Sequence, residues 1–322
     1  MRCLCCGKEI AEQAELQYRW HKRCVRSFFG VDDLPRINVT EKELEDLANA
    51  CVAQGLTVPG VQKKLSLHLS QDPDARLTLA DHPTGYILKP QTEDFSHLPE
   101  AEDLVMRLAG QAGIKTVPHA LIRMEAQNGA YAYITKRIDR LIPRGAKKQK
   151  MLAMEDFCQL AGHLTEDKYH GSYELCARLI KRYSARPGLD LAELFLRLLF
   201  CYVTGNSDMH LKNFSLIETE PCSRDYVLSA AYDLLPVNLV MPEDTEEMAL
   251  TLNGKKRNLH RNDFMKYAEN CGLQEKVADN MLGRILSMKD SFIRTCEGSL
   301  LPDDKRDQMC RLIEDRMDVL TR

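Results

Sequence analysis

The 322-residue chain lacks several features that would place it in a specialised class of proteins. It has no run approaching the roughly 18 apolar residues that a membrane-spanning helix needs. Its first residues, MRCLCCGKEIAEQ, lack the apolar centre of a secretory signal. The net charge is only −3, so no global field attracts the chain to nucleic acid or to an anionic membrane. These absences predict a folded cytoplasmic protein that has no contact with a membrane.

Cysteine, in contrast, is frequent, with twelve residues. In a cytoplasmic chain these thiols are expected to be buried or metal-bound rather than paired in disulfides. Cys3 and Cys6 are separated by two residues, and His21 and Cys24 repeat this spacing after a gap of fourteen residues. Two such pairs supply the four ligands of a tetrahedral Zn²⁺ site. The spacing therefore predicts one structural zinc, with Cys5 as an alternative to Cys3 or Cys6.

The sequence pattern separates three regions. Residues 1–36 form a small zinc-knuckle-like segment, called the cysteine module below. Residues 37–140 contain three runs typical of strands, LSLHLS, YILKP and YAYITKRI, and one amphipathic helix in PEAEDLVMRLAGQAGI. Residues 141–322 predict helices in MEDFCQLAGHL, YELCARLIKRYS, LAELFLRLLFCYVTGN, DFMKYAEN and PDDKRDQMCRLIEDRMDVL, with a strand pair in FSLIE and DYVLSAAYDLLPV. The predicted fold class is α+β, with a small β-rich N-lobe and a larger, mainly helical C-lobe.

A polar segment, TGNSDMHLKNFSL, follows the apolar run LFLRLLFCYV and contains Asp208, His210, Lys212 and Asn213. The five-residue step from Asp208 to Asn213 repeats the D-x-x-x-x-N spacing by which a kinase loop places its base and a metal ligand. Phosphoryl transfer needs such a carboxylate, oxygen ligands for Mg²⁺ and a lysine against the phosphates. The segment favours a phosphoryl-transfer site over the alternative of a solvated polar loop.

Four further residues stand where such a site needs them. Lys89 ends a predicted strand, and Glu102 follows thirteen residues later in the predicted helix. Asp233, after a short apolar run, is a candidate second metal-binding carboxylate. Upstream, Gly60 in GLTVPGVQKKLSLHL would let backbone amides approach phosphate oxygens. The P-loop pattern G-x-x-x-x-G-K-[ST] does not occur.

Six motifs, in this order, resemble the HipA-like serine/threonine kinases of bacteria, which are toxins of type II toxin–antitoxin systems: TVPGVQKKLSLHL, YILKPQ, TKRIDR, MEDFCQLAG, GNSDMHLKNFSL and AAYDLLP. The resemblance covers residues from about 50 to 322 and is closest to the short HipT members, which lack the N-terminal subdomain of HipA. It implies a bilobal HipA-like kinase fold. The cysteine module in front of that fold departs from the family pattern.

The resemblance implies a role for each matched residue. Asp208 would be the catalytic base, Asn213 and Asp233 the Mg²⁺ ligands, and Lys212 a cation at the transferred phosphoryl group. For His210, orienting the loop and taking part in catalysis both remain open. The residues implied to hold ATP, through its phosphates, the inter-lobe hinge or the adenine side, are Pro59, Gly60, Val61, Gln62, Lys63, Lys64, Lys89, Glu102, Lys136, Arg137, Ile138, Asn213, Tyr232 and Asp233.

Regulation by autophosphorylation is also implied. HipA-like kinases modify a serine in the glycine-containing loop, and the matching position here is Thr57. Pro59 stands at another position where short members carry a serine, and proline cannot be phosphorylated. Self-inactivation through Thr57 is therefore expected, with fewer sites than in the family.

The implied function is an ATP- and Mg²⁺-dependent kinase acting on a translation component such as an aminoacyl-tRNA synthetase. The expected partners are a HipB-type antitoxin, which would make any DNA contact indirect, and optionally a HipS-like small protein. The alternatives are a catalytically inactive kinase-fold binding module and an effector kinase acting on other proteins. The basic stretches RGAKKQK and NGKKRNLHR could touch tRNA, but the lack of interleaved aromatic residues favours a solvated face.

The cysteine module itself has two interpretations. It could clamp the neighbouring small lobe, or it could dock a separate antitoxin or target. The apolar residues Phe28 and Phe29, just past Cys24, favour packing against the lobe.

Overall fold

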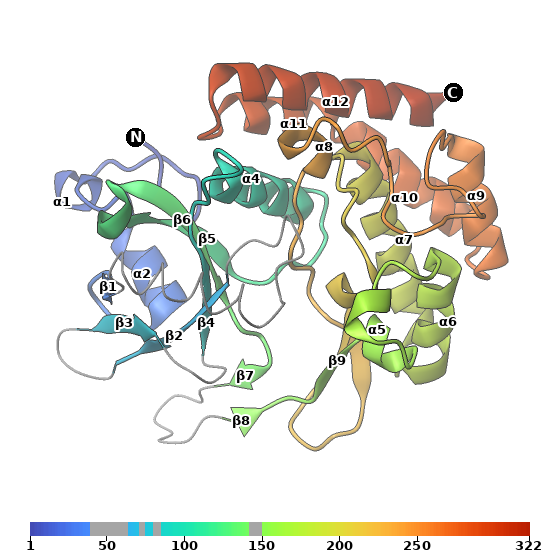
Figure 1. Ribbon diagram of the computed structural model, residues 1–322, viewed down its shortest axis with the longest axis horizontal. Coiled ribbons are helices and arrows are strands. Elements are labelled where there is room, and N and C mark those ends of the chain that lie inside the picture. Colours follow the sequence, from blue (N-terminus) through green and yellow to red (C-terminus); the bar gives the residue numbers. More distant parts are fainter. Residues whose placement is uncertain (39–63, 71–74, 80–84, 142–149) are drawn as a thin grey trace. The chain divides into compact units, whose positions relative to one another are not determined.

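The computed structural model describes residues 1–38, 64–70, 75–79, 85–141 and 150–322, and Figure 1 labels its helices and strands. The chain divides into two compact units. The first unit comprises Met1–Asp103 and Val117–Arg137, and the second comprises Leu104–Thr116 and Ile138–Arg322. The cysteine module belongs to the first unit. The expected three-part division, with boundaries at 36 and 140, stays a prediction.

Within the described residues of the first unit, six strands form one sheet in the order β1-β3-β2-β4-β6-β5. Neighbouring strands are antiparallel, except that β1 and β3 are parallel. Leu67, Leu88 and Ile134, on three adjacent strands, are fully buried and form the centre of this unit's core. The strands are β1 (Arg36–Asn38), β2 (Leu65–Leu69), β3 (Arg76–Leu79), β4 (Tyr86–Lys89), β5 (His119–Met124) and β6 (Ala130–Lys136). The predicted strands LSLHLS, YILKP and YAYITKRI are confirmed as β2, β4 and β6.

Short helices accompany the sheet in the first unit: α1 (Gln13–Leu16), α2 (Lys22–Phe29) and η1 (Glu125–Gln127). The helix predicted in PEAEDLVMRLAGQAGI is confirmed as α4 (Leu98–Gln111), which begins in the first unit and ends in the second. Gly113 closes α4 with a φ of +78°, a backbone conformation that glycine adopts without strain. A side chain at Gly113 would also overlap the guanidinium of Arg284.

The second unit is built around α7 (Pro187–Val203), which packs against α6, α10 and α12 (Figure 1). Pro187 occupies the first helical turn, where its missing N–H leaves no backbone hydrogen bond unmade. Leu194, Leu198 and Phe200 are fully buried along the helix. The other helices are α5 (Phe157–Leu160), η2 (Thr165–Asp167), α6 (Tyr173–Tyr183), η3 (Leu211–Asn213), α8 (Val237–Val240), α9 (Arg261–Asn270), α10 (Glu275–Ser287), α11 (Lys289–Glu297) and α12 (Asp303–Thr321). The predicted helices α6, α7, α9 and α12 are confirmed.

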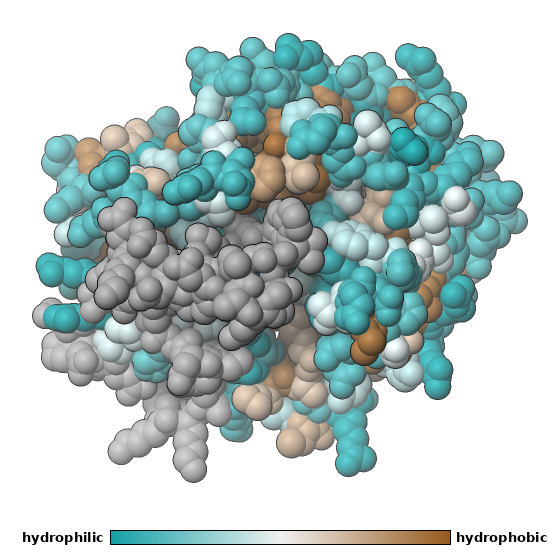
Figure 2. All heavy atoms as spheres, in the orientation of Figure 1, coloured by the Kyte–Doolittle hydropathy of each residue, from teal (hydrophilic) through white to brown (hydrophobic). Residues whose placement is uncertain are grey.

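Helix α12 illustrates how the sequence pattern places a helix at the surface. Met309, Ile313, Met317 and Leu320 recur at three- and four-residue spacing and are buried. The opposite face is hydrophilic, as the surface along the top of Figure 2 shows. No helix in the described part of the chain is both long and apolar enough to cross a lipid bilayer.

A three-stranded antiparallel sheet in the second unit has the order β11-β10-β9, with β9 (Met154–Asp156), β10 (Ser215–Glu218) and β11 (Tyr226–Leu228). The strand pair predicted in FSLIE and DYVLSAAYDLLPV is confirmed as β10 and β11. The single helix predicted in MEDFCQLAGHL is wrong, because its first residues pair with β10 and only the four residues of α5 are helical. Asp156 ends the strand and starts the helix, since its side chain and that of Gln159 form a capping box. Two shorter strands, β7 (Arg140–Leu141) and β8 (Lys150–Met151), pair with each other.

Candidate functional site

The polar segment predicted as the reactive centre follows the C-terminus of α7. Gly205 turns the chain there with a φ of +66°, and a Cβ at this position would lie 2.6 Å from a leucine side chain of α12. Met209 and Leu211 are fully buried and anchor the loop. Asp208 lies between these anchoring residues and the turn, and its side chain is 46% exposed. Alternating apolar and polar residues thus fix the loop while one carboxylate faces solvent.

Asp208 is held by hydrogen bonds on several of its atoms. The phenol of Tyr169 donates to Oδ1 of Asp208 at 2.5 Å. The backbone carbonyl of Asp208 accepts hydrogen bonds from the backbone N–H of His210 and from Nδ2 of Asn213, both at 2.8 Å. The backbone N–H of Asp208 donates to Oδ1 of Asn206 at 3.2 Å. Because Asn213 uses its NH₂ group on this carbonyl, the amide oxygen of Asn213 is the atom that could bind a metal.

His210 lies behind the exposed carboxylate. Its ring packs edge-on against Tyr169 with a centroid distance of 5.0 Å, and its Nε2 is 4.0 Å from Oδ1 of Asp208. Burial lowers the pKa of His210 to about 4, and the charge of Lys168 acts in the same direction, while Asp208 and Asp233 oppose the shift. The imidazole is therefore neutral at pH 7. A neutral, buried ring fits the loop-orienting interpretation better than the catalytic one.

Tyr232 directly precedes Asp233 and contacts Lys212 of the Asp208 loop. Nζ of Lys212 forms a 3.0 Å ion pair with Asp156 at the end of β9. The hydroxyl of Tyr232 donates to the backbone carbonyl of Lys212 at 3.1 Å, and it lies 2.5 Å from Oγ of Ser215. Burial raises the pKa of Tyr232, so its hydroxyl stays protonated and can donate. Tyr232 therefore connects the segment that carries Asp233 to the loop that carries Asp208.

Asp233 has a φ of +54°, a left-handed conformation that is uncommon for a residue with a side chain. Such backbone conformations cluster at functional sites, where the surrounding structure enforces them. The charge of Asp233 opposes the lowering of the His210 pKa that burial causes. The carboxylate of Asp233 and the amide oxygen of Asn213 are of the hard oxygen type that Mg²⁺ prefers.

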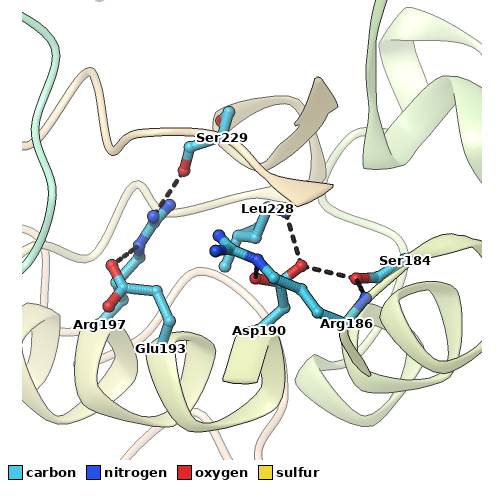
Figure 3. Close-up of polar contacts among 7 residues, drawn as sticks. All are labelled: Ser184, Arg186, Asp190, Glu193, Arg197, Leu228 and Ser229. Carbon is cyan, nitrogen blue, oxygen red and sulfur yellow. Dashed lines mark hydrogen bonds and ion pairs between the residues drawn. The ribbon is translucent and has the colours of Figure 1, made fainter. Parts of the chain in front are cut away.

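A network of two groups of polar contacts, around the buried Asp190 and Arg197 of α7, fixes the segment that leads to Asp233 (Figure 3). Asp190 of α7 accepts hydrogen bonds from the backbone N–H of Leu228 at 2.8 Å and from Oγ of Ser184 at 2.6 Å. Arg197, about two turns further along α7, donates to the carbonyl of Ser229 at 2.6 Å. The network comprises Ser184, Arg186, Asp190, Glu193, Arg197, Leu228 and Ser229. It ties the end of β11 to the helix whose C-terminus starts the Asp208 loop.

The first unit carries the predicted Lys89–Glu102 pair. Nζ of Lys89, at the end of β4, lies 2.5 Å from Oε1 of Glu102 in α4, and both side chains are at least 96% buried. The ammonium of Lys89 also lies 5.2 Å from the centre of the Tyr133 ring. Such a buried pair contributes little net stability because desolvation offsets the attraction. A functional reason for its presence is therefore favoured.

The remaining predicted nucleotide residues fall into two groups. The hinge residues Lys136, Arg137 and Ile138 span the boundary between the two units, which lies after Arg137. Nζ of Lys136 lies 5.8 Å from the centre of the Phe28 ring, and burial lowers the pKa of this lysine. Lys64 directly precedes β2. The other predicted residues of the glycine-containing loop lie outside the described residues: Thr57, Pro59, Gly60, Val61, Gln62 and Lys63.

The predicted zinc ligands Cys3, Cys6, His21 and Cys24 come together in the first unit, with all four ligand atoms within 4.8 Å of one another. Nδ1 of His21 is 3.4 Å from Sγ of Cys6 and 3.8 Å from Sγ of Cys24. With Zn–S and Zn–N bonds of about 2.3 and 2.0 Å, ligand atoms of a tetrahedral site lie about 3.5–3.8 Å apart. Cys5 is not among these four residues, which favours Cys3 and Cys6 as the ligands.

The surroundings of the cluster also fit a metal. Nε2 of His21 hydrogen-bonds to the carbonyl of Glu9 at 3.0 Å, which leaves Nδ1 for the ion, as in second-shell contacts of metal-bound histidines. Burial and the neighbouring thiols Cys3 and Cys5 raise the pKa of Cys24. A bound cation would favour the ionised form of these neighbouring thiols. The cluster can therefore hold one metal ion with no open coordination position.

Sequence reasoning missed three residues that hold the site together: Tyr169, Asp156 and Asp190. Tyr169 and Asp208 are 39 positions apart, and Asp190 and Leu228 are 38 apart. No spacing rule connects residues at such separations, since the contacts exist only after the helices and the small sheet have packed. The DKYHG segment around Tyr169 offered only a lone aromatic residue within a polar turn.

A family model described as the HipA-like C-terminal domain matches residues 56–292. A Haemophilus influenzae protein named "Putative kinase" is 26% identical over 83% of this chain and 82% of its own length. Two Sinorhizobium fredii proteins, "Putative kinase Y4dM" and "Putative kinase Y4mE", are 32% and 31% identical over 69% and 68% of this chain. The matches span 55% and 51% of those two relatives, so the chain matches about half of their length.

Two solved structures share the fold. HipA from Shewanella oneidensis, in a complex with HipB and operator DNA, superposes with a TM-score of 0.69 at 20% identity, over 82% of this chain and 65% of that one. The proinflammatory kinase CtkA from Helicobacter pylori gives a TM-score of 0.55 at 13% identity, over 80% of this chain and 93% of that one. These similarities confirm the predicted α+β kinase-like fold class.

Proposed function

The chain belongs to the HipA-like C-terminal domain family, and we propose that it is an ATP- and Mg²⁺-dependent protein serine/threonine kinase. The observation that carries the proposal is the loop after α7, where Asn213 holds an exposed Asp208 and the hydroxyl of Tyr232 connects the Asp233 segment to the same loop. Kinase chemistry requires this combination of a carboxylate base and oxygen ligands. The curated relatives support the kinase class, while serine/threonine specificity is part of the proposal.

In the proposed reaction the oxygen of an acceptor hydroxyl attacks the γ-phosphorus of ATP, and ADP leaves. Asp208 accepts the proton of that hydroxyl. Tyr169 would orient the carboxylate for this step through its hydrogen bond to Oδ1. Asn213 and Asp233 would hold Mg²⁺, which neutralises charge on the phosphates when it is bound. Lys212, held by Asp156, would face the transferred group. His210 would keep the loop in shape as a neutral ring.

Residues of the first unit would bind the nucleotide. We propose that Lys89 contacts the α- and β-phosphates and that Glu102 fixes its position. The glycine-containing residues 59–64 would cover the phosphates, and residues 136–138 would form the hinge near adenine. Tyr232, whose hydroxyl faces the Lys212 carbonyl, would act indirectly by positioning Asp233.

The substrate and partners are proposed from the family. The Shewanella relative forms a complex with HipB and operator DNA, and we extend to this chain a HipB-type antitoxin as partner. A translation component such as an aminoacyl-tRNA synthetase is the proposed target, and a HipS-like partner stays a prediction. Comparing phosphopeptides from cells that express the wild type or Asp208→Asn identifies the target. A synthetase among the proteins phosphorylated only by the wild type supports the target proposal. The absence of any synthetase from that set contradicts the proposal.

We further propose that the cysteine cluster binds one structural Zn²⁺. Three thiolates and one imidazole are a frequent ligand set of structural zinc. Metal analysis of the purified full-length chain should give about one zinc per chain. Purified protein without zinc, or with a different metal in stoichiometric amount, contradicts this assignment.

Thr57 is the proposed site of autophosphorylation. Intact-mass measurement after incubation with ATP and Mg²⁺ should show one added phosphate, and Thr57→Ala should abolish it. Phosphate mapped to Ser66 in β2 or to any other residue would contradict the assignment.

A direct test of the kinase proposal uses purified protein, γ-labelled ATP and a titration of Mg²⁺. We expect the label to appear on serine or threonine, to depend on Mg²⁺ and to vanish in EDTA. Nucleotide binding without transfer to any polypeptide would instead favour a kinase-fold binding module.

A further inference from the structure

We propose that the metal-bound cysteine module is an integral part of the first unit, where it closes the sheet at the edge strand β5 and supports β4. The sheet order places β5 at one edge, where backbone N–H and C=O groups would otherwise face solvent. Open edges of this kind invite pairing with other chains, and proteins commonly cover them.

The module covers this edge through residues that adjoin its metal ligands. The backbone N–H of Leu121, in β5, donates to the carbonyl of Leu4 at 3.1 Å. The indole Nε1 of Trp20 donates to the carbonyl of Leu121 at 3.2 Å. Leu4 directly follows the ligand Cys3, and Trp20 directly precedes the ligand His21. Fixing the two ligands around one ion therefore fixes both groups that satisfy the backbone of Leu121 in the edge strand.

A second contact connects the module to β4 through aromatic rings. Phe28 and Phe29 of α2 pack against each other with centroids 4.8 Å apart, and Phe29 lies 5.4 Å from the ring of Tyr86 in β4. Trp20 packs against Phe28 at 5.6 Å. The hydroxyl of Tyr86 donates to the carbonyl of Phe28 at 3.3 Å. Phe28 and Phe29 are only 4% and 5% exposed, so they favour the clamp interpretation of the module over docking.

The module needs the ion because its own secondary structure is small. Within it, α1 has four residues and α2 has eight, too few to fold without further support. Cys24 lies one turn before Phe28 on α2, so the ion also anchors the helix that carries the aromatic contact. Metal binding to such segments supplies folding free energy directly. Loss of the ion should therefore loosen β5 and β4 rather than the module alone.

One consequence rests on the proposed function. Tyr86 opens β4 and Lys89 ends it, so the ring contact supports the strand that presents the proposed phosphate-binding lysine. The contacts of the cysteine module with β5 and β4 do not depend on that role of Lys89, and their test uses no nucleotide.

The test compares Cys24→Ser with Cys5→Ser in the full-length chain, because Cys5 is a neighbouring thiol outside the ligand group. Metal content and amide hydrogen exchange are measured for both variants and the wild type. We expect Cys24→Ser to lose the metal and to raise exchange in β5 (His119–Met124) by at least about tenfold. Exchange in β10 (Ser215–Glu218), in the second unit, serves as the internal reference and should not change. Cys5→Ser should keep the metal and the wild-type exchange.

Trp20→Phe provides an independent variant, because it keeps all four ligands and an aromatic ring next to Phe28 but removes the indole donor to Leu121. It should retain the metal and still raise exchange in β5, by roughly fivefold for one lost hydrogen bond. Unchanged β5 protection in both Trp20→Phe and metal-free Cys24→Ser overturns the proposal. If Cys24→Ser does not fold, the Trp20→Phe result decides alone. If the wild type transfers no phosphate while Cys24→Ser raises exchange in β5, the proposed function is contradicted and the structural role of the cysteine module stands.

Discussion

The phenol of Tyr169 donates a 2.5 Å hydrogen bond to Oδ1 of Asp208, although the two residues are 39 positions apart. The contact is fixed at both ends. The backbone N–H of Leu211 donates to the carbonyl of Lys168, which ties the Tyr169 segment to the Asp208 loop. The His210 ring packs against the Tyr169 ring from the buried side. Burial and the charge of Asp208 raise the pKa of Tyr169, so the phenol stays a donor.

Tyr169→Phe should lower kcat by about tenfold to a hundredfold, since a hydrogen bond to a charged group contributes about 1.5–3 kcal/mol. KM for ATP should not change, because the phenol orients the base and does not bind nucleotide. In an Asp208→Asn background the same change should have no further effect. Steady-state kinetics of the four proteins measure this coupling, with the partly exposed Tyr183→Phe as control. A Tyr169→Phe enzyme faster than wild type would mean that the phenol blocks the acceptor position instead.

The Lys89–Glu102 pair should separate stability from catalysis. Lys89→Met leaves Glu102 as a buried charge without this partner and should destabilise the protein by about 3–5 kcal/mol. The double variant Lys89→Met/Glu102→Leu replaces both charges with apolar groups and should recover most of that loss. Thermal melting measures the stability, and labelled-ATP transfer measures activity. The double variant should stay inactive, and wild-type activity in it would remove Lys89 from the mechanism.

His210 should give the protein an acid-dependent loss of stability. Its pKa is about 4 in the folded chain, mainly because of burial, against about 6.5 when unfolded. The unfolded state therefore binds more protons between these values, and stability is lost as pH falls from about 6.5 to 4. The contribution is up to about 3 kcal/mol. Urea unfolding at several pH values should show a shallower loss for His210→Gln than for wild type. His170→Gln, at a histidine whose side chain is 76% exposed, is the matched control, and equal slopes for both variants would refute the assignment.

The network in Figure 3 should be a major support of the second unit. Asp190 is 1% exposed and accepts from Leu228, Ser184 and Arg186. Asp190→Ala leaves the buried N–H of Leu228 without its acceptor and should cost about 1–3 kcal/mol. Exposed Glu220→Ala should stay within about 0.5 kcal/mol of wild type. Denaturant midpoints measure both, and a small effect of Asp190→Ala would mean that the segment before Asp233 is held by other contacts.

The fold was predictable where the pattern is local. Alternating and helical spacing identified β2, β4, β6, α4, α7 and α12, because each buries a periodic face. The cysteine cluster was predictable for the same reason, since its ligand pairs are close in sequence. Strand β9 was not predicted, because its three residues become a strand only by pairing with β10. Three residues before a helix are too few to show a periodicity that separates a strand from a helix.

The site was predictable as a set of residue types and less so as a geometry. Asp208, Lys212 and Asn213 lie within six positions of the sequence, so the sequence alone predicts that they share one loop. The orienting contacts from Tyr169 and Asp156 depend on packing between segments that are dozens of residues apart. The left-handed backbone at Asp233 also carried no signal, because the residues around it, AAYDLLP, contain no glycine.

The most direct measurement compares wild type with Asp208→Asn for transfer of the γ-phosphate from labelled ATP to protein in the presence of Mg²⁺. Asparagine keeps the size of the side chain but cannot take the proton of the acceptor hydroxyl. Thermal melting and nucleotide affinity, measured for both proteins, show whether the variant is folded. The account predicts transfer slowed by about 10²–10⁴, with melting temperature and nucleotide affinity close to wild type. Equal transfer by both proteins would contradict it.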